Sequence, residues 1–423
     1  MNLSYDEGQN DELSLSNWSG GKALEKGCTE AIAPLKILMI APTPYFFDRG
    51  CHVRIYEEAR TLISRGHKVR IVTYNLGRDL PPVPVDRTLK IPWYSKRDAG
   101  PSWHKLYIDL LLLCTTLKVA KNFRPDLIHA HLHEGAFIGW FVARFQSVPL
   151  LFDYQGSLGG ELLNHGFFRS GTVIHKLFSY LEGWINRLAD QIITSSTPGK
   201  GELIKEWKLQ ETRVISLPDG VDTTVFRHFS RAAARERLKL DEEVPVIIYL
   251  GLLNSYQGVD LLIHAARLMI QQGRNFHLVI MGFPEEEYRQ LADDLNIASF
   301  VTFTGRVDYS DAPQLLAAAD LAVSPKISET EANGKLLNYM ACGLPVVAFD
   351  TPVNREIMGD DGIYAVFADV VDLARCLSNA LSDREGLRQR GRQMRGRVIE
   401  QLSWDIRVLE LESVYRKLLA VEK

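Results

Sequence analysis

Apolar and polar residues alternate in a regular way from residue 35 to the end of the chain. Short, continuous apolar runs, such as residues 35–41, are typical of strands that a parallel sheet buries on both faces. Between these runs, apolar residues recur at helical spacing, as Val53, Tyr56, Ala59 and Leu62 do. The chain therefore predicts strands and helices in strict alternation.

The pattern predicts two series of strands. The first series is expected at 35–41, 68–74, 126–131, 149–153, 191–195 and 213–217, and the second at 246–251, 277–282, 301–303, 321–324 and 346–350. Helices are expected at about 53–63, 103–122, 136–145, 172–188, 198–207, 258–272, 285–295, 312–318 and 368–381. Alternating strands and helices favour doubly wound parallel sheets.

A break in the pattern at Pro218–Asp222, followed by a charged region at 227–243, separates the two series. We therefore expect an α/β fold of two Rossmann-like domains that face each other across a cleft, at residues 34–218 and 219–400. Residues 401–423 are expected to form a helix that packs back on the first domain. The polar residues 1–33 lack the apolar core of a secretion signal and are interpreted as a disordered extension.

Composition excludes several classes of function. The 423 residues carry a net charge of -3, so there is no basic excess for binding nucleic acid. The five cysteines are scattered and form no C-x-x-C pair, which indicates neither zinc nor a disulfide framework and favours a reducing, cytoplasmic location. No apolar stretch reaches the ~18 residues that a membrane-spanning helix requires.

The segment 324–347 predicts a binding site for an anion. It contains a polar loop, then Gly334 at the start of a short helix whose buried stripe is Leu336, Leu337 and Met340. Glycine allows close approach of the backbone to a ligand, and the N-terminus of a helix attracts phosphate. Gly50 is expected at a similar helix start after the first strand. This first unit lacks the G-x-G-x-x-G motif, which disfavours a simple nicotinamide dehydrogenase.

Taken in order, several segments resemble the glycosyltransferase family 4 group, whose members are retaining enzymes of GT-B fold that use nucleotide-sugar donors. The resemblance covers about residues 35–420 and rests on segments 36–41 with Gly50, 65–69, 126–131, 190–195, 218–222 with Phe226, 258–262, Gly305 and 340–347. It implies an acceptor-binding first domain, a donor-binding second domain, and transfer without a metal or other cofactor. No Asp-x-Asp motif for a metal-bound diphosphate is present.

The resemblance also implies the donor site. Glu331 would contact the transferred sugar, with Glu329 as the alternative, and Asn338 would hold the ribose where the family has a glutamate. The diphosphate would lie at Gly50, Gly334 and Lys335, Asn333 would also bind the donor, and Gly305, Arg306 and Val307 would border the base. Leu252 and Gln257 stand where the family places an arginine and a lysine, and Lys335, Lys326 and Arg306 are the cations that could replace them.

On the acceptor side, the resemblance places His131 beside the donor sugar, with His133 as the alternative. His129 is expected to point into the sheet. The three histidines would also allow a zinc site, but Glu134 is the sole further ligand that the sequence indicates, and we predict no metal. Asp153 and Gln155 are expected to line the acceptor cleft. Arg49 could contact an anion, as could Arg54 unless it forms a surface ion pair with Glu57 or Glu58.

The predicted function is retaining transfer of a hexose from a nucleoside diphosphate sugar to a hydroxyl of a glycan, a lipid-linked glycan or a small acceptor, as in polysaccharide biosynthesis. The alternatives are an inactive GT-B protein that binds sugar or a partner enzyme, and a nucleotide-sugar epimerase. Aromatic and cationic residues at 103–107 and 167–187 also predict peripheral contact with an anionic membrane, such as the inner face of the plasma membrane.

Overall fold

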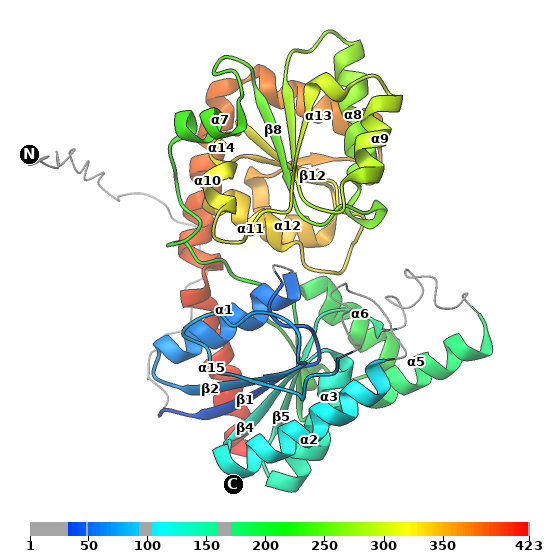
Figure 1. Ribbon diagram of the computed structural model, residues 1–423, viewed down its shortest axis with the longest axis vertical. Helices are drawn as coiled ribbons and strands as arrows, with labels where there is room; N and C mark the ends of the chain where they lie inside the picture. Colours follow the sequence, from blue (N-terminus) through cyan, green and yellow to red (C-terminus); the bar gives the residue numbers. More distant parts are fainter. Residues whose placement is uncertain (1–32, 48–49, 93–103, 159–170, 422–423) are drawn as a thin grey trace, which may run out of the picture. The chain divides into compact units, whose positions relative to one another are not determined.

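The computed structural model describes residues 33–47, 50–92, 104–158 and 171–421. Within them the chain forms two parallel sheets, each covered by helices (Figure 1). This α/β architecture of two doubly wound sheets confirms the predicted fold class. Most of the expected N-terminal extension lies outside the described residues.

The first sheet has seven parallel strands in the order β3-β2-β1-β4-β5-β6-β7. The strands are β1 (Lys36–Ala41), β2 (Lys68–Thr73), β3 (Val85–Arg87), β4 (Leu127–His131), β5 (Leu150–Tyr154), β6 (Gln191–Thr194) and β7 (Val214–Ser216). The helices that follow these strands are α1 (Gly50–Ser64), α2 (Lys105–Phe123), α3 (Leu132–Gln146), α5 (Val173–Ile185) and α6 (Thr197–Trp207).

The second sheet has six parallel strands in the order β10-β9-β8-β11-β12-β13. The strands are β8 (Val246–Leu250), β9 (His277–Met281), β10 (Val301–Gly305), β11 (Leu321–Ser324), β12 (Val346–Phe349) and β13 (Ile363–Ala365). The helices of this half are α7 (Arg231–Leu238), α8 (Val259–Gln271), α9 (Glu286–Asp294), α10 (Ala312–Leu316), α11 (Gly334–Ala341), α12 (Pro352–Met358), α13 (Val370–Ser382) and α14 (Arg384–Arg397).

Four elements escaped the sequence pattern because they are short or strongly polar. They are the edge strands β3 and β13 and the helices α7 and α12. Helix α7 lies in the charged region between the two series of strands, where it buries Arg235 completely. The guanidinium of Arg235 donates to the carbonyls of Asp241, Glu242, Val244 and Ala318 and pairs with Asp320. Arg235 therefore anchors the connection between the two series of strands from the inside and does not face solvent.

The C-terminal helix α15 (Trp404–Val421) packs against α1 on one face of the first sheet (Figure 1). Its apolar side chains share a core with strand and α1 residues: Leu411, Val414, Tyr415, Leu418, Ile37, Met39, Ile55 and Leu62. The opposite face of the sheet carries α2 and α3. Because both faces are covered, the side chains that point out of the central strands β1, β4 and β5 are buried whether they are apolar or polar.

Candidate functional site

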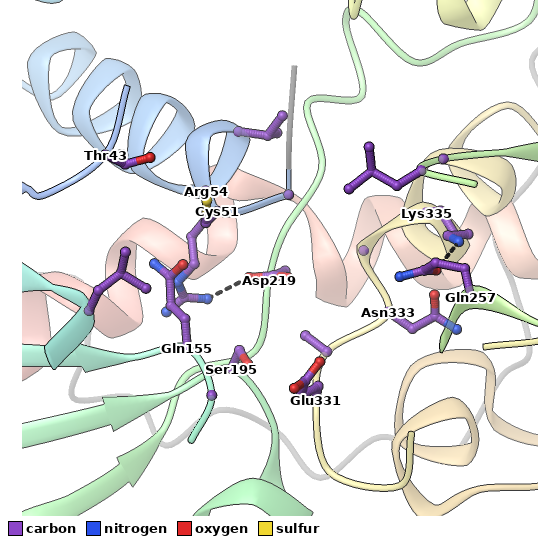
Figure 2. Close-up of a pocket in the computed structure, with 18 of the residues that line it drawn as sticks. Thr43, Cys51, Arg54, Gln155, Ser195, Asp219, Gln257, Glu331, Asn333 and Lys335 are labelled. Carbon is purple, nitrogen blue, oxygen red and sulfur yellow. Dashed lines mark hydrogen bonds and ion pairs between the residues drawn. The ribbon is translucent and has the colours of Figure 1, made fainter. Parts of the chain in front are cut away.

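A cleft of about 710 Å³ is lined by loops at the carboxyl ends of strands from both sheets. Arg54, Gln155 and Asp219 form one wall, and Gln257, Asn333 and Lys335 form the other, with Glu331 between them (Figure 2). The volume suits a small-molecule ligand, and ligands of open parallel sheets bind at this end of the strands.

The side of the cleft that the sequence predicts to bind the donor is built around the N-terminus of α11. Helix α11 begins at Gly334, as the sequence predicts. Asn333, which precedes it, is buried, and its amide donates to Ser324 Oγ and to Asn354 Oδ1 at 3.0 and 2.9 Å. These bonds fix the loop, while a Cβ at Gly334 would meet no atom closer than Asp219 Oδ2 at 3.6 Å. The start of the helix is therefore rigidly held and open to the cleft.

Lys335 points back toward the end of β8. Its ammonium donates to Tyr249 Oη at 3.0 Å and to Gln257 Oε1 at 2.5 Å, and it lies over the Tyr249 ring. A Cβ at Gly251, whose φ is +148°, would come within 3.0 Å of the same nitrogen. Burial, together with the nearby Lys326, lowers the pKa of Lys335 well below its ordinary value. The site thus holds a poorly solvated amine among neutral partners.

The structure separates the three cations that the sequence offers as replacements. Lys335 touches Gln257, the position where the resemblance calls for a lysine. Lys326 instead donates to Glu331 at 3.3 Å and to the Ala332 carbonyl at 2.8 Å. Arg306 is exposed and lies over the rings of Phe283 and Phe47, outside the lining of the cleft, whereas its neighbour Val307 lines it. Of these three cations, Lys335 is the one that contacts Gln257.

Glu331 lies in the cleft, and Glu329 is exposed outside its lining. The carboxylate of Glu331 accepts a hydrogen bond from Tyr256 Oη as well as from Lys326. Gly156, in the loop after β5, has a φ of +153°, which favours glycine, and a Cβ there would be in ordinary contact with Glu331 Oε1 at 3.5 Å. Asn338, one turn into α11, also lines the cleft.

The histidines of β4 and α3 differ in their position relative to the cleft. His133 lines the cleft, with its ring against Phe152 and Tyr154 and its Nε2 3.5 Å from Glu182 Oε1. Burial lowers its pKa even though carboxylates oppose the change. His131 is fully buried below the lining, because the chain turns at Leu132 (φ +60°) between the two. The histidine that the sequence treated as the alternative thus lines the cleft, although the residue is only 4% exposed.

Asp153 is also buried below the cleft, whereas Gln155 lines it and donates to Asp153 Oδ2 at 2.7 Å. Gly50 lines the cleft at the start of α1. Arg49 lies outside the described residues. The structure therefore brings Gly50, His133, Gln155, Val307, Glu331, Asn333, Gly334, Lys335 and Asn338 together in the cleft, and leaves His131, Asp153 and Arg306 out of its lining.

Two family models match the chain and divide it as the two sheets do. The model described as Glycosyltransferase Family 4 matches residues 49–225, and the one described as Glycosyl transferases group 1 matches residues 244–383. The chain belongs to the glycosyltransferase family 4 group. Its two doubly wound sheets are the GT-B fold.

Relatives and solved structures agree with this assignment. The chain is 27% identical to a D-inositol 3-phosphate glycosyltransferase of Geodermatophilus obscurus, over 86% of this chain and 84% of the relative. It is similar in fold to a sucrose-phosphate synthase of Thermosynechococcus elongatus, with a TM-score of 0.78, 20% identity and coverage of 92% of this chain and 100% of the other. Anabaena Alr3699/HepE in complex with UDP and glucose has a TM-score of 0.73 at 16% identity, over 90% of this chain and 100% of the other.

The sequence missed the role of Arg54 in this glycosyltransferase. Arg54 forms the expected ion pair with Glu58, but both side chains are buried rather than on the surface. Its guanidinium also bonds Asp153 Oδ2 at 2.9 Å and Asp219 Oδ1 at 2.6 Å, which ties α1 to β5 and to the connection between the sheets (Figure 2). Burial opposes its charge, yet Asp153, Glu58 and Asp219 raise its pKa well above the ordinary value. The i, i+4 spacing of Arg54 and Glu58 was the available signal.

Among the described residues, no helix combines the length and the apolar content that crossing a membrane requires.

Proposed function

We propose that this glycosyltransferase transfers a hexose from a nucleoside diphosphate sugar to a hydroxyl group, with retention of configuration at the anomeric carbon. The observation that carries the proposal is the pairing of an open helix N-terminus at Gly334 with the Lys335 ammonium beside Gly251. Backbone N–H groups, a helix dipole and one ammonium form a site for a diphosphate. The neighbour that binds UDP and glucose makes a uridine nucleotide the first donor to test.

In the proposed reaction, the bond between the anomeric carbon and the leaving diphosphate oxygen breaks. The acceptor oxygen bonds to the anomeric carbon on the same face, and its proton passes to the departing diphosphate. Charge develops on the diphosphate, where Lys335 and the α11 N-terminus would stabilise it. No protein base is required, and the chain needs no metal for this step.

The other residues of the cleft have positioning roles in this proposal. Glu331, which already accepts bonds from Tyr256 and Lys326, would accept further bonds from hydroxyls of the sugar. Asn338 would bond the ribose, and Val307 would border the base. His133 faces the cleft and would contact the sugar near the reacting carbon, with His131 supporting the wall from below.

The acceptor is proposed to be a glycan or a lipid-linked glycan presented at an anionic membrane. Helix α5 exposes a row of apolar side chains in which Val173, Leu177 and Tyr180 are 82%, 63% and 76% exposed. The exposed Lys176 and Arg187 flank this row. Apolar side chains flanked by cations bind an interface with anionic headgroups. The expected contacts at 103 and at 167–169 fall outside the described residues.

Sedimentation with vesicles tests this surface. The protein should bind vesicles that contain phosphatidylglycerol more strongly than neutral phosphatidylcholine vesicles. The double substitution Leu177→Glu and Tyr180→Glu should abolish binding, while Leu89→Glu, at an equally exposed apolar residue, should not. Equal binding of the double variant would overturn the assignment of α5.

A thermal-shift screen tests the donor site. Nucleoside diphosphates and their sugars are added to the folded protein and to Gly334→Trp, in which an indole fills the start of α11. A ligand that binds the folded state alone raises the midpoint of unfolding. One diphosphate should raise it in the wild type and not in the variant, and transfer from that donor is then measured with glycans, lipid-linked glycans and inositol phosphates. A folded wild type that responds to no donor would replace the proposal with the inactive, sugar-binding alternative.

A further inference from the structure

Four buried side chains converge beneath the floor of the cleft. They are Glu58 of α1, His129 and His131 of β4, and Asp153 of β5, and each offers a ligand atom within 4.8 Å of the others. None of them is more than 1% exposed. Strand periodicity explains part of this arrangement, since His129 and His131 point to the same face of β4 and their rings lie 4.5 Å apart.

The hydrogen bonds of the cluster leave a set of inward-facing atoms without partners. His129 Nδ1 is bonded to Tyr415 Oη, and His131 Nδ1 to Asp153 Oδ2, each at 2.9 Å. Among the described residues, no hydrogen bond reaches the Nε2 atoms of the two histidines, Asp153 Oδ1 or either oxygen of Glu58. Because a carboxylate oxygen can only accept, His131 carries its proton on Nδ1 and presents a lone pair at Nε2.

The two buried carboxylates of the cluster also share the same buried cation, Arg54. Arg54 Nε is 2.9 Å from Asp153 Oδ2 and 3.2 Å from Glu58 Oε1, and Arg54 Nη1 bonds Asp219. Glu58 and Asp153, which are both fully buried, thus share this one guanidinium with Asp219, whose side chain is 21% exposed at the cleft. Buried charges of this kind are costly unless they are paired or bind a metal. Each of the two buried carboxylates keeps at least one oxygen without a hydrogen-bond partner in the described part of the chain, and a divalent cation would bind these oxygens.

We propose that Glu58, His129, His131 and Asp153 bind one divalent transition-metal ion of the zinc class. Two imidazoles and two carboxylates are a ligand set that Zn²⁺ accepts, with bonds of about 2.0–2.2 Å in a tetrahedron. Ligand atoms around such an ion are about 3.3 Å apart, so the four would draw together by about 1.5 Å at most. Tyr415 would orient His129, and Arg54 with Gln155 would orient Asp153, as outer hydrogen bonds do in metal sites.

The ion would have a structural role and would not touch the donor diphosphate. It would join α1, β4 and β5, and through Tyr415 it would fix α15 to the same point. Arg54 and Gln155 both contact Asp153 and both line the cleft, so the ion would also hold this wall in place. This proposal does not depend on the donor-site proposal, since metal binding is measured without a sugar.

Metal content tests the site directly. Protein freed of any affinity tag is stripped with a chelator, incubated with Zn²⁺, dialysed and measured by mass spectrometry of the metal. The wild type should retain about one equivalent and should unfold at a higher temperature with zinc than without it. Glu58→Gln and His129→Gln should lose both effects. The controls Glu57→Gln, next to Glu58 on α1, and His277→Gln, in the second sheet, should keep them.

Cobalt binding by the wild type gives a second measurement that needs no variant. Co²⁺ in a site of two imidazoles and two carboxylates produces visible ligand-field bands, which Zn²⁺ should then displace. If Glu58→Gln or His129→Gln fails to fold, the presence or absence of these bands in the wild type decides whether the metal site exists. A wild type that retains no zinc and shows no such bands, or a folded Glu58→Gln variant that keeps a full equivalent of zinc, would overturn the proposal.

Discussion

The ammonium of Lys335 lies 2.5 Å from Oε1 of Gln257, although the two residues are 78 positions apart. Gln257 occupies the place of a lysine in the family resemblance, and Lys335 comes from α11. The amine of a residue from a distant helix thus reaches the point of the cleft where the resemblance calls for a lysine. This relationship favours an active donor site over an inactive one.

Replacing Lys335 should weaken binding of a nucleoside diphosphate. We expect Lys335→Met to reduce the affinity by about 10- to 100-fold, since a hydrogen bond to a charged group contributes about 1.5–3 kcal/mol. Isothermal titration calorimetry with UDP measures the effect, and Lys118→Met, at an exposed lysine of α2, is the control. Equal affinities of Lys335→Met and the wild type would remove Lys335 from the diphosphate site.

Binding of the diphosphate should also take up protons. Burial lowers the pKa of Lys335 in the free protein, and an adjacent phosphate would raise it again. Because the bound state would then hold this proton more tightly than the free protein does, binding should be coupled to proton uptake, and affinity should fall as the pH rises through the pKa of the free amine. Calorimetry at about pH 8, where a terminal phosphate is ionised, in two buffers of different ionisation enthalpy measures this uptake. Lys335→Met should show none, and its absence in the wild type would contradict the assignment.

Glu331 should affect the reaction more than nucleotide binding. Its carboxylate lies in the middle of the cleft. Among the described residues, its hydrogen-bond partners are Tyr256 and Lys326. We expect Glu331→Gln to lower kcat by about 10²–10³ and to leave the Kd of the nucleoside diphosphate nearly unchanged, because the lost interaction acts on the transferred sugar. Glu329→Gln, two residues away and exposed, should keep normal turnover. The reverse result would favour Glu329 as the sugar contact.

The stability of the protein should depend on Glu57. Burial, opposed by Arg60, raises the pKa of Glu57 to about 7. Because the folded state binds this proton more tightly than the unfolded state, the stabilisation is complete below the ordinary pKa near 4.5 and is lost as the pH rises through 7. Relative to wild type, Glu57→Gln should gain up to about 3 kcal/mol in the free energy of unfolding between pH 5 and pH 8. Urea titrations at the two pH values measure the difference, and a constant difference would refute the shift.

The order of strands and helices could be predicted from the sequence. Buried parallel strands are continuous apolar runs, and the helices between them have one apolar stripe, so the periodicity alone predicts the alternation. The start of α11 at Gly334 followed from the same local pattern. The edge strands β3 and β13 did not, because short, half-buried strands carry little periodic signal.

The place of the histidines could not be predicted. His131 and His133 are two residues apart, and an uninterrupted strand would point them to the same face. The positive φ of Leu132 ends β4 and starts α3, which carries His133 to the cleft and leaves His131 below it. A residue such as leucine gives no sign of this conformation.

By itself, the sequence determined the family, the two parallel sheets and the start of α11 at Gly334, since each depends on short-range patterns of polarity and on glycine. Only the tertiary structure decided that Lys335 reaches Gln257, and that Glu58 is buried with His129 and His131. Glu58 is inaccessible because α15, which begins at Trp404, packs over α1 on that face of the sheet. Burial depends on packing between distant segments, and no local pattern at Glu58 could show it.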